Sequence, residues 1–250
     1  MRADPTVAEL TAFQQDGFLV ARGLLAPGHL ADIRRWTDQI AAEPEVPGRQ
    51  MVYYEDSLTR PGQRIVQRIE NFCPFHSGFD HLLRRSPLRD WAGALLGAEA
   101  VLFKDKINFK LPGGSGFRPH QDQQAGWTIY APLFLTAMLS IDDSTIENGC
   151  LEIAAGRHKE GLIGDEWRPL EPEGLSLEPV PTKAGDAIFF DSFVPHASGP
   201  NQTRSPRRTL YVTYALARHG DHRTRYFADK RRDFPPDIER EPGRTYTFRV

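Results

Sequence analysis

Three residues of this chain have the types and the spacing that could hold a metal ion. His120 and Asp122 are separated by one residue, and His196 follows about seventy residues later, after an apolar stretch. Residues two apart on a β-strand point to the same face, so a strand here would aim an imidazole and a carboxylate into one space. A second imidazole from a facing strand would complete the set. Two nitrogens and one oxygen on one side suit iron(II) and leave positions open for a cosubstrate and dioxygen.

Each part of this pattern is weak by itself. Most H-x-D triplets are surface residues, and a single histidine such as His196 is more often a hydrogen-bonded polar residue than a metal ligand. The surroundings strengthen the interpretation. A glycine-rich run at 113–116 precedes His120, and a turn leads into an apolar strand pattern at 187–190. A cluster of arginines then precedes a second strand pattern at 209–216. The candidate ligands therefore lie beside turns and strands that a barrel could bring together.

Four segments resemble one enzyme family in sequence, order and spacing. They are residues 104–114 (KDKINFKLPGG), 119–122 (PHQD), 147–158 (ENGCLEIAAGRH) and 195–207, which begins with PHASGPN. The family is the phytanoyl-CoA hydroxylase-like (PhyH) group of dioxygenases. The resemblance implies that the two histidines and the aspartate hold iron(II), that 2-oxoglutarate is the cosubstrate and that O2 is the oxidant.

The resemblance also implies where 2-oxoglutarate binds. Its far carboxylate needs a fixed cation, and arginine matches a carboxylate bidentately where lysine offers a point charge. Family spacing places this role on Arg207, eleven residues after His196, and Ser198 would add a hydroxyl group. Lys110 and Asn108 are the other predicted contacts of the cosubstrate.

The implied reaction converts 2-oxoglutarate and O2 into succinate and CO2 while an unactivated C–H bond of a substrate is hydroxylated. The identity of residue 122, an aspartate, indicates whether such an enzyme hydroxylates or halogenates its substrate. Related halogenases have a small residue at that position, which frees a site for halide. The aspartate therefore favours hydroxylation over halogenation.

The strand pattern at 101–111 alternates along the chain. One face is expected to carry Phe103, Asp105, Ile107 and Phe109. The other face is expected to carry Lys104, Lys106, Asn108 and Lys110. Lysines on such a face usually point from an edge strand into solvent. In a barrel the same face can line the cavity, which makes these polar residues candidates to contact an anionic ligand.

Substrate recognition is the least determined part of the site. The predicted substrate contacts are Lys104, Lys106, Gln123, Trp127, Tyr53 and Asn71. A pocket with lysines, amides and aromatic rings favours a small polar or zwitterionic anion over a long acyl chain. The candidates are an aminoalkylphosphonate, an amino-acid-like compound and an intermediate of a natural product, and the sequence does not choose among them.

The first hundred residues carry the helix signals. A capping-box pattern starts a helix at Thr6, apolar residues recur at helical spacing over 27–42, and Ser86 precedes a proline at a third helix start. Residues 49–80 show no strong periodicity, so they are either an irregular surface connection or loops that contact a ligand. The segment 161–181 is expected to run over the surface or beside the mouth of a barrel.

Strand patterns dominate from residue 100 onward, separated by glycine and proline turns. The predicted fold is mainly β with helical cover: a double-stranded β-helix, the cupin-like jelly roll barrel. We expect a single domain, 1–250, with a mostly helical cover at 1–99, a jelly-roll core at 100–217 and a C-terminal extension at 218–250. The extension should pack along the outside of the barrel or across a dimer contact.

Composition agrees with one enzyme domain that acts on a small molecule. A chain of 250 residues can bury a large core, and its net charge of −2 offers no basic surface for nucleic acid. No apolar run approaches the roughly 18 residues of a membrane span. Cys73 and Cys150 lie far apart, which favours reduced thiols and a cytoplasmic protein. We expect a monomer or a homodimer.

Two other functions could use the same residues. One is a non-catalytic jelly-roll binding protein, in which the three candidate ligands serve packing only. The other is a zinc hydrolase with the same triad, for which 2-oxoglutarate would be irrelevant. Dependence on 2-oxoglutarate separates the dioxygenase from both.

Overall fold

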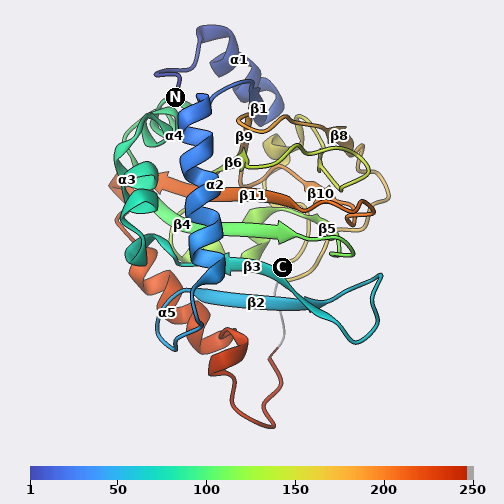
Figure 1. Cartoon of the computed structure of the whole chain (residues 1–250). Coiled ribbons are helices and arrows are strands. Elements are labelled where there is room, and N and C mark those ends of the chain that lie inside the picture. The colour runs from blue at the N-terminus through green and yellow to red at the C-terminus, as the bar shows by residue number, and fades with distance from the viewer. Residues whose placement is uncertain (247–250) are drawn as a thin grey trace.

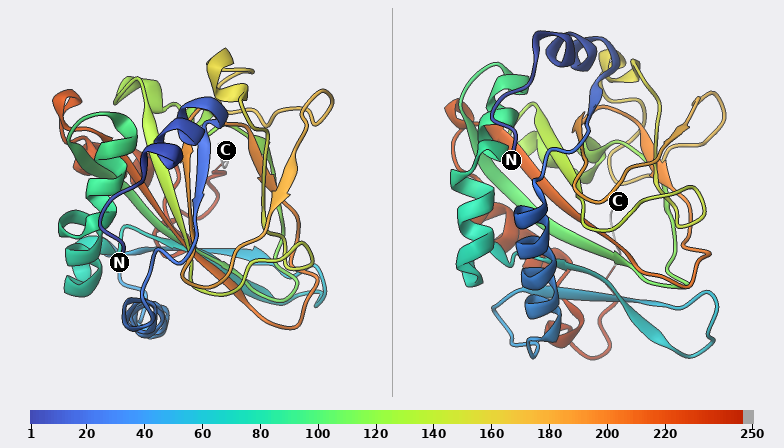
Figure 2. Two further views of the ribbon diagram at one scale, coloured as in Figure 1. Left: turned by 90° about the horizontal axis from the view of Figure 1, so that it is seen from above. Right: turned by 45° about the horizontal axis from the view of Figure 1, so that its top comes forward.

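The computed structural model describes residues 1–246, and two antiparallel sheets form its centre. The strands of the larger sheet follow the order β1-β9-β6-β11-β4-β3-β2, and those of the smaller sheet follow the order β5-β10-β7-β8. Figure 2 shows the two sheets facing each other. The predicted jelly roll is confirmed, and the last four residues of the predicted C-terminal extension lie outside the described residues.

The larger sheet draws strands from both halves of the chain. Its strands are β1 (Phe18–Ala21), β2 (Met51–Asp56), β3 (Arg64–Glu70), β4 (Ala100–Lys110), β6 (Phe134–Ser140), β9 (Ala187–Asp191) and β11 (Arg207–Leu216). The smaller sheet consists of β5 (Phe117–His120), β7 (Leu151–Ile153), β8 (Glu178–Val180) and β10 (His196–Ser198). Two of the candidate ligands, His120 and His196, lie on these short strands.

Helices from the first hundred residues pack on the larger sheet. They are α1 (Val7–Asp16), α2 (Pro27–Ala42), α3 (Ser77–Arg85) and α4 (Pro87–Leu96), and α5 (Arg223–Asp233) follows the last strand. The three predicted helix starts are confirmed, since Thr6 forms its capping box, α2 begins at Pro27 and Ser86 accepts a hydrogen bond from the Leu88 amide. In Figure 1, α2 crosses in front of the sheet. No helix within residues 1–246 combines the length and the apolar character needed to cross a membrane.

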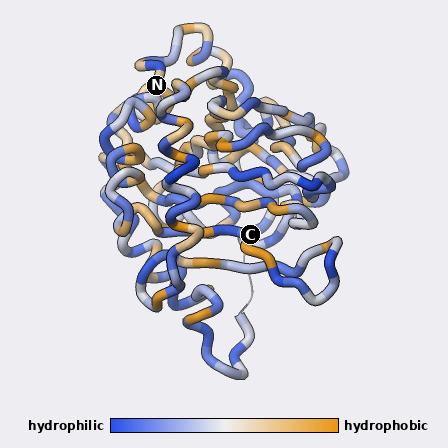
Figure 3. Tube along the Cα trace, viewed as in Figure 1, coloured by the Kyte–Doolittle hydropathy of each residue, from blue (hydrophilic) through white to orange (hydrophobic). Residues whose placement is uncertain are grey.

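The prediction for residues 49–80 was wrong in one respect. This stretch forms the β2–β3 hairpin, which extends the larger sheet beyond β4, followed by α3. Figure 3 shows the polar tip of this hairpin. The N-terminal cover is therefore less helical than expected, because β1, β2 and β3 all join the sheet. The loop between β4 and β5 contacts this hairpin, since Ser115 donates to Glu55 and the Leu58 amide donates to the Gly113 carbonyl.

A β-bulge changes the predicted alternation in β4. The register against β11 shifts between Thr213 and Tyr214, so one residue of β4 has no partner there. As a result, Phe103 does not share a face with Ile107, which packs in the core beneath the helices. Its ring instead contacts the rings of Trp127 and Tyr226, at 5.4 and 4.5 Å between centroids, on the side of the cavity. The bulge thus turns an additional aromatic ring toward the cavity.

Candidate active site

The candidate metal ligands come from two neighbouring strands of the smaller sheet. His120 is the last residue of β5, His196 is the first of β10, and the two are cross-strand partners. Asp122 does not continue the strand, as the sequence had predicted, but begins a 3₁₀ turn at Asp122–Ala125. Because the chain turns there, the carboxylate is brought back beside the imidazoles. Thr136 on β6 holds it with a hydroxyl donated at 2.9 Å.

The three side chains converge with their ligand atoms within 4.8 Å of one another. The imidazole centroids are 4.3 Å apart, and His196 Nε2 lies 3.9 Å from Asp122 Oδ1. Each ring places Nδ1 beside a carbonyl two residues earlier: Arg118 at 2.7 Å and Val194 at 3.0 Å. An Nδ1–H donated to these carbonyls fixes the tautomer in which Nε2 is free to bind a metal.

The electrostatics of the triad suit a divalent cation. Burial lowers the pKa of His120 and of His196, so both imidazoles are neutral near pH 7 and ready to act as ligands. Burial opposes the charge of Asp122, but the two histidines and nearby lysines together hold its pKa below the ordinary value. Two neutral nitrogens and one carboxylate match the donor set that iron(II) oxygenases use.

An inward-facing row of polar residues leads away from the triad along β4 and β11. In register, Lys110 faces Arg207, Asn108 faces Thr209, and Lys104 faces Thr213. Thr213 and Thr136 lie 3.1 Å apart, which links the near end of the row to the aspartate. A narrow inner part of the cavity contains Asn108, Ser198 and both histidines. The predicted inward orientation of the polar face of β4 is therefore confirmed.

Arg207 closes the far end of this row with unused hydrogen-bonding capacity. Its side chain is 1% exposed, and within residues 1–246 its Nε and Nη2 atoms have no hydrogen-bond acceptor. The Oδ1 atom of Asn108 and the hydroxyl of Thr209 are buried and lack partners as well. A buried guanidinium without an acceptor is costly. The row therefore fits an anionic ligand that supplies one.

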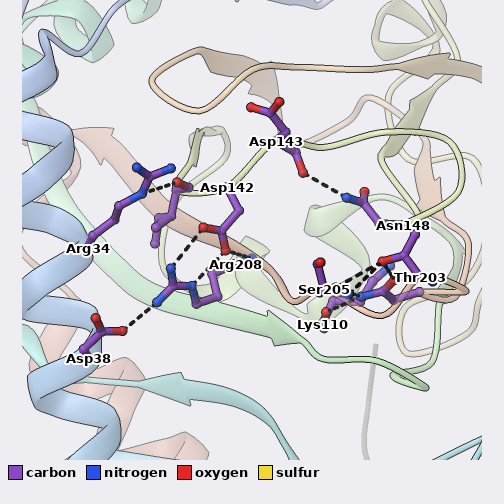
Figure 4. A network of polar contacts seen from close by, with 11 residues as sticks. Arg34, Asp38, Lys110, Asp142, Asp143, Asn148, Thr203, Ser205 and Arg208 are labelled. Carbon is purple, nitrogen blue, oxygen red and sulfur yellow. Dashed lines mark hydrogen bonds and ion pairs between the residues drawn. The ribbon is translucent and has the colours of Figure 1, made fainter.

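Arg208, the next residue, points to the opposite face. Figure 4 shows its guanidinium between Asp142 and Asp38, at 2.8 and 2.6 Å. Both of its acceptors come from the protein. The two adjacent arginines are therefore distinguished by their partners as well as by their direction.

Lys110 supports the inner site indirectly, through hydrogen bonds to Ser198 and to backbone carbonyls. Its ammonium donates to the Ser198 hydroxyl at 2.8 Å and to the carbonyls of Gly199 and Gly149, at 2.5 and 3.4 Å. Burial, reinforced by Arg207, lowers its pKa to about 6. The predicted direct contact with the cosubstrate is not what this arrangement favours, because the donors of Lys110 already hold the end of β10. Ser198 is thereby fixed in place beside the triad.

The wider part of the cavity lies on the other side of the triad. It has a volume of about 200 Å³, and its lining includes Lys104, Lys106, Trp127, His120 and Asp122. The structure thus places these two lysines and Trp127 in the lining of this space, and their contact with a substrate stays a prediction. The Lys104 ammonium lies 5.3 Å from the Trp127 ring and that of Lys106 lies 4.6 Å from the Tyr211 ring.

The two lysines take no part in the ion pairs of the cavity. Among residues 1–246, those pairs include Glu70 with Arg68 and Lys230, and Asp122 with His196. Burial, together with repulsion from Lys104, lowers the pKa of Lys106 to about 7. Burial also opposes the charge of Lys104, but Tyr226 and Glu70 raise its pKa above the ordinary value. Ammonium groups in this position can interact with an anion next to the metal ligands.

Three predicted substrate contacts lie outside this cavity. The Tyr53 hydroxyl donates to the Phe234 carbonyl at 2.8 Å, and Asn71 accepts a hydrogen bond from Arg223. Gln123 is fully buried and its amide donates to the Ala131 carbonyl. Each side chain serves a neighbouring backbone or side-chain group, so the structure does not bring these three residues into the lining of the cavity.

Several further residues line the cavity without having been predicted individually as substrate contacts. They are Arg68 and Glu70, from the stretch for which ligand contact was one alternative, and Trp167, Tyr226 and Lys230. Arg68 and Glu70 lie on either side of an apolar residue of β3, which is the period of two expected for a strand. The bulge opposite Tyr53 and Tyr54 obscures this period in the sequence. The last two are four residues apart on α5 and so share a face. The expectation that the C-terminal extension packs outside the barrel is thereby corrected, because α5 forms part of the cavity wall.

Comparison with known proteins agrees with this site. The profile of the family described as Phytanoyl-CoA dioxygenase (PhyH) matches residues 13–209. The chain is 37% identical over 251 residues to a 2-aminoethylphosphonate dioxygenase from Uncultured bacterium HF130_AEPn_1, covering 97% of this chain and 94% of that protein. It is 39% identical over 238 residues to a methylphosphonate hydroxylase from Gimesia maris, covering 94% and 90%.

Solved structures show the same fold. EctD from S. alaskensis, crystallised with 2-oxoglutarate and 5-hydroxyectoine, has a TM-score of 0.72 at 21% identity and covers 86% of this chain and 77% of its own. The two rival functions, a non-catalytic binding protein and a zinc hydrolase, do not agree with the matched profile and relatives. The chain belongs to the PhyH family and is an iron(II)- and 2-oxoglutarate-dependent dioxygenase.

Proposed function

We propose that this enzyme hydroxylates a C–H bond of a small organophosphonate. The observation that carries the proposal is the pair of ammonium groups, Lys104 and Lys106, that line the cavity beside the triad and take no part in its ion pairs within residues 1–246. A phosphonate resembles a phosphate group, which carries about 1.5 to 2 negative charges near pH 7. Two lysines can match that charge, whereas a single carboxylate would leave one of them uncompensated.

The relatives support this substrate class. One is named for 2-aminoethylphosphonate and the other for methylphosphonate, and both align with nearly the whole chain. An amino-acid-like substrate would also need an acceptor for its α-ammonium group, close to the anion site. The unpartnered groups at that place are cations, which favours the phosphonate over an amino acid.

We assign the iron to His120, Asp122 and His196, and the far carboxylate of 2-oxoglutarate to Arg207 and Ser198. Bound iron and 2-oxoglutarate supply the activation of O2, with one oxygen atom entering the alcohol and the other entering succinate. The protein fixes the positions of the reactants. Lys104 and Lys106 would hold the phosphonate so that its neighbouring carbon faces the iron, and Trp127 would limit the entry of water.

The test is a screen of the purified enzyme with iron(II), 2-oxoglutarate and air. The panel contains methylphosphonate, ethylphosphonate, 2-aminoethylphosphonate, alanine and small carboxylates, with succinate and hydroxylated product both measured. We expect hydroxylated product from a phosphonate and succinate in equal amount. Coupled turnover of carboxylates alone would contradict the proposed substrate class.

Variants of the two lysines make the test specific to the site. Lys104→Met and Lys106→Met should each raise the KM for the phosphonate by at least about tenfold, since a charge-assisted hydrogen bond contributes about 1.5–3 kcal/mol. The KM for 2-oxoglutarate should change little. Lys183→Met is the matched control, because that side chain is 78% exposed and pairs with Asp143.

A further inference from the structure

The cavity contains one deeply buried carboxylate apart from the metal ligand. Glu70, at the end of β3, is 1% exposed and lines the cavity with Lys104 and Lys106. Its Oε1 accepts from Arg68 Nε at 2.7 Å, and its Oε2 accepts from the Lys230 ammonium at 2.5 Å. Burial raises the pKa of this carboxyl, but Lys230 and the other cations outweigh burial and hold it well below the ordinary value.

Lys230 reaches Glu70 from α5, across the mouth of the cavity. Its side chain is 12% exposed, and its ammonium lies 5.6 Å from the Tyr53 ring and 6.0 Å from the Tyr226 ring. The ammonium group of a substrate would bind to the same kinds of group, a carboxylate oxygen and the faces of aromatic rings. Lys230 therefore stands where the amine of a short zwitterionic substrate would be bound.

The other carboxylates of the cavity lining are also matched by cations. Asp233 receives both Nε and Nη2 of Arg232, at 2.8 and 2.9 Å. Asp229 accepts from the Tyr130 hydroxyl at 2.7 Å and pairs with Arg232 at 2.8 Å. Among the described residues that line the cavity, no carboxylate apart from the metal ligand is left for a substrate amine. Around the buried Glu70, an additional positive charge would meet Lys230, Lys104 and Arg68, and the juxtaposition of like charges is unfavourable.

We infer that Lys230 determines the substrate specificity of the enzyme. Because its ammonium is paired with the Glu70 carboxylate, the enzyme favours phosphonates with an uncharged carbon chain over aminoalkylphosphonates. This inference rests on the proposed phosphonate hydroxylation. The aromatic wall fits the same preference, since Trp127, Tyr226 and Tyr130 offer apolar surface beyond the two lysines. The enzyme would then resemble the methylphosphonate relative in its substrate charge more than the aminoethylphosphonate relative.

The test compares two substrates that differ only by an amine, ethylphosphonate and 2-aminoethylphosphonate. For the wild-type enzyme, kcat/KM should be at least about tenfold higher for ethylphosphonate than for 2-aminoethylphosphonate. This factor is smaller than the full repulsion between two adjacent like charges would produce. In Lys230→Met, Oε2 of Glu70 becomes available, and the ratio should shift by about tenfold or more toward the amine. The ratio is unaffected by a loss of folded protein, because both substrates are measured on one preparation.

Two further variants identify the cause of the shift. Lys230→Arg keeps a cation beside Glu70 and should keep the wild-type preference. Adding Glu70→Gln to Lys230→Met removes the released acceptor and should abolish the gain for the amine. A wild-type preference for 2-aminoethylphosphonate, or an unchanged ratio in Lys230→Met, would overturn the inference. Absence of product from every phosphonate would instead overturn the proposed function, so the two failures are distinguishable.

Discussion

At the scale of single residues, the two arginines that end the polar row show how direction decides the role of a charge. Arg207 is buried and, within residues 1–246, its Nε and Nη2 atoms have no acceptor, whereas Arg208 points outward and is bound by Asp142 and Asp38. Their adjacency on one strand makes them opposite in face by necessity. Sequence spacing could distinguish them, because strand alternation at β11 is regular from Arg207 to Thr213.

We predict that Arg207→Ala raises the KM for 2-oxoglutarate by at least about 30-fold while leaving iron(II) affinity nearly unchanged. Removal of one partner from a buried charge pair costs about 2–5 kcal/mol. Iron affinity is measured by anaerobic titration, and the KM is measured from succinate release. Arg208→Ala is the control, since its guanidinium is directed at the surface carboxylates. Equal effects of the two substitutions would mean that the anchoring arginine has been misassigned.

The lowered pKa of Lys106 predicts a pH dependence of anion binding. Its ammonium is present below the pKa of about 7 and is lost as the pH rises through that value. A short alkylsulfonate keeps the same charge between about pH 6 and 9, so its inhibition constant reports the enzyme alone. We expect the constant to rise by about tenfold per pH unit above about pH 7. In Lys106→Arg, which stays charged, the profile should be flat; a flat wild-type profile would contradict this account.

At the scale of elements, the β2–β3 hairpin and α5 form the side of the cavity that sequence patterns did not reveal. A half-buried strand is recognised by apolar residues at every second position. On β3, however, Arg68 and Glu70 line the cavity, and the extra residue Gln67 forms a bulge in β3 that shifts the period. The functional residues themselves therefore hide the pattern by which the strand could have been found.

The contact between Tyr53 and Phe234 is predicted to hold α5 against the hairpin. The Tyr53 hydroxyl donates to the Phe234 carbonyl at the end of α5, and the two rings stack at 5.5 Å. Tyr53→Phe should lower the free energy of unfolding by about 1–3 kcal/mol, because a buried carbonyl loses its donor. It should also raise the KM for the substrate and leave that for 2-oxoglutarate unchanged.

Tyr54→Phe is the matched control for this prediction. The hydroxyl of Tyr54 reaches Glu45 near the surface, so its loss should change the free energy of unfolding by less than about 0.5 kcal/mol. Urea unfolding measures stability, and steady-state kinetics measure both KM values. If the two substitutions have the same effect on stability and on substrate KM, the contact of Tyr53 does not position α5.

At the scale of the whole molecule, residues far apart in the sequence meet around one cavity. The triad, the jelly roll and the inward lysines were predictable, because each follows from local spacing or from family motifs. Glu70 and Lys230 were not, because their pairing joins β3 to α5 across 160 positions and neither segment carries a motif. Gln123 was misplaced for a related reason: proximity to the metal ligands does not determine on which side of a turn a side chain lies.

The central claim is that His120, Asp122 and His196 hold one ferrous ion beside a 2-oxoglutarate anchored on Arg207. An anaerobic crystal structure with iron(II) and 2-oxoglutarate, with the metal located by its anomalous scattering, tests it most directly. The account predicts one iron at about 2.0–2.2 Å from both Nε2 atoms and an aspartate oxygen, the range typical of such ligands, and a cosubstrate carboxylate on the Arg207 guanidinium. An iron bound elsewhere, or a cosubstrate carboxylate that avoids Arg207, would contradict it.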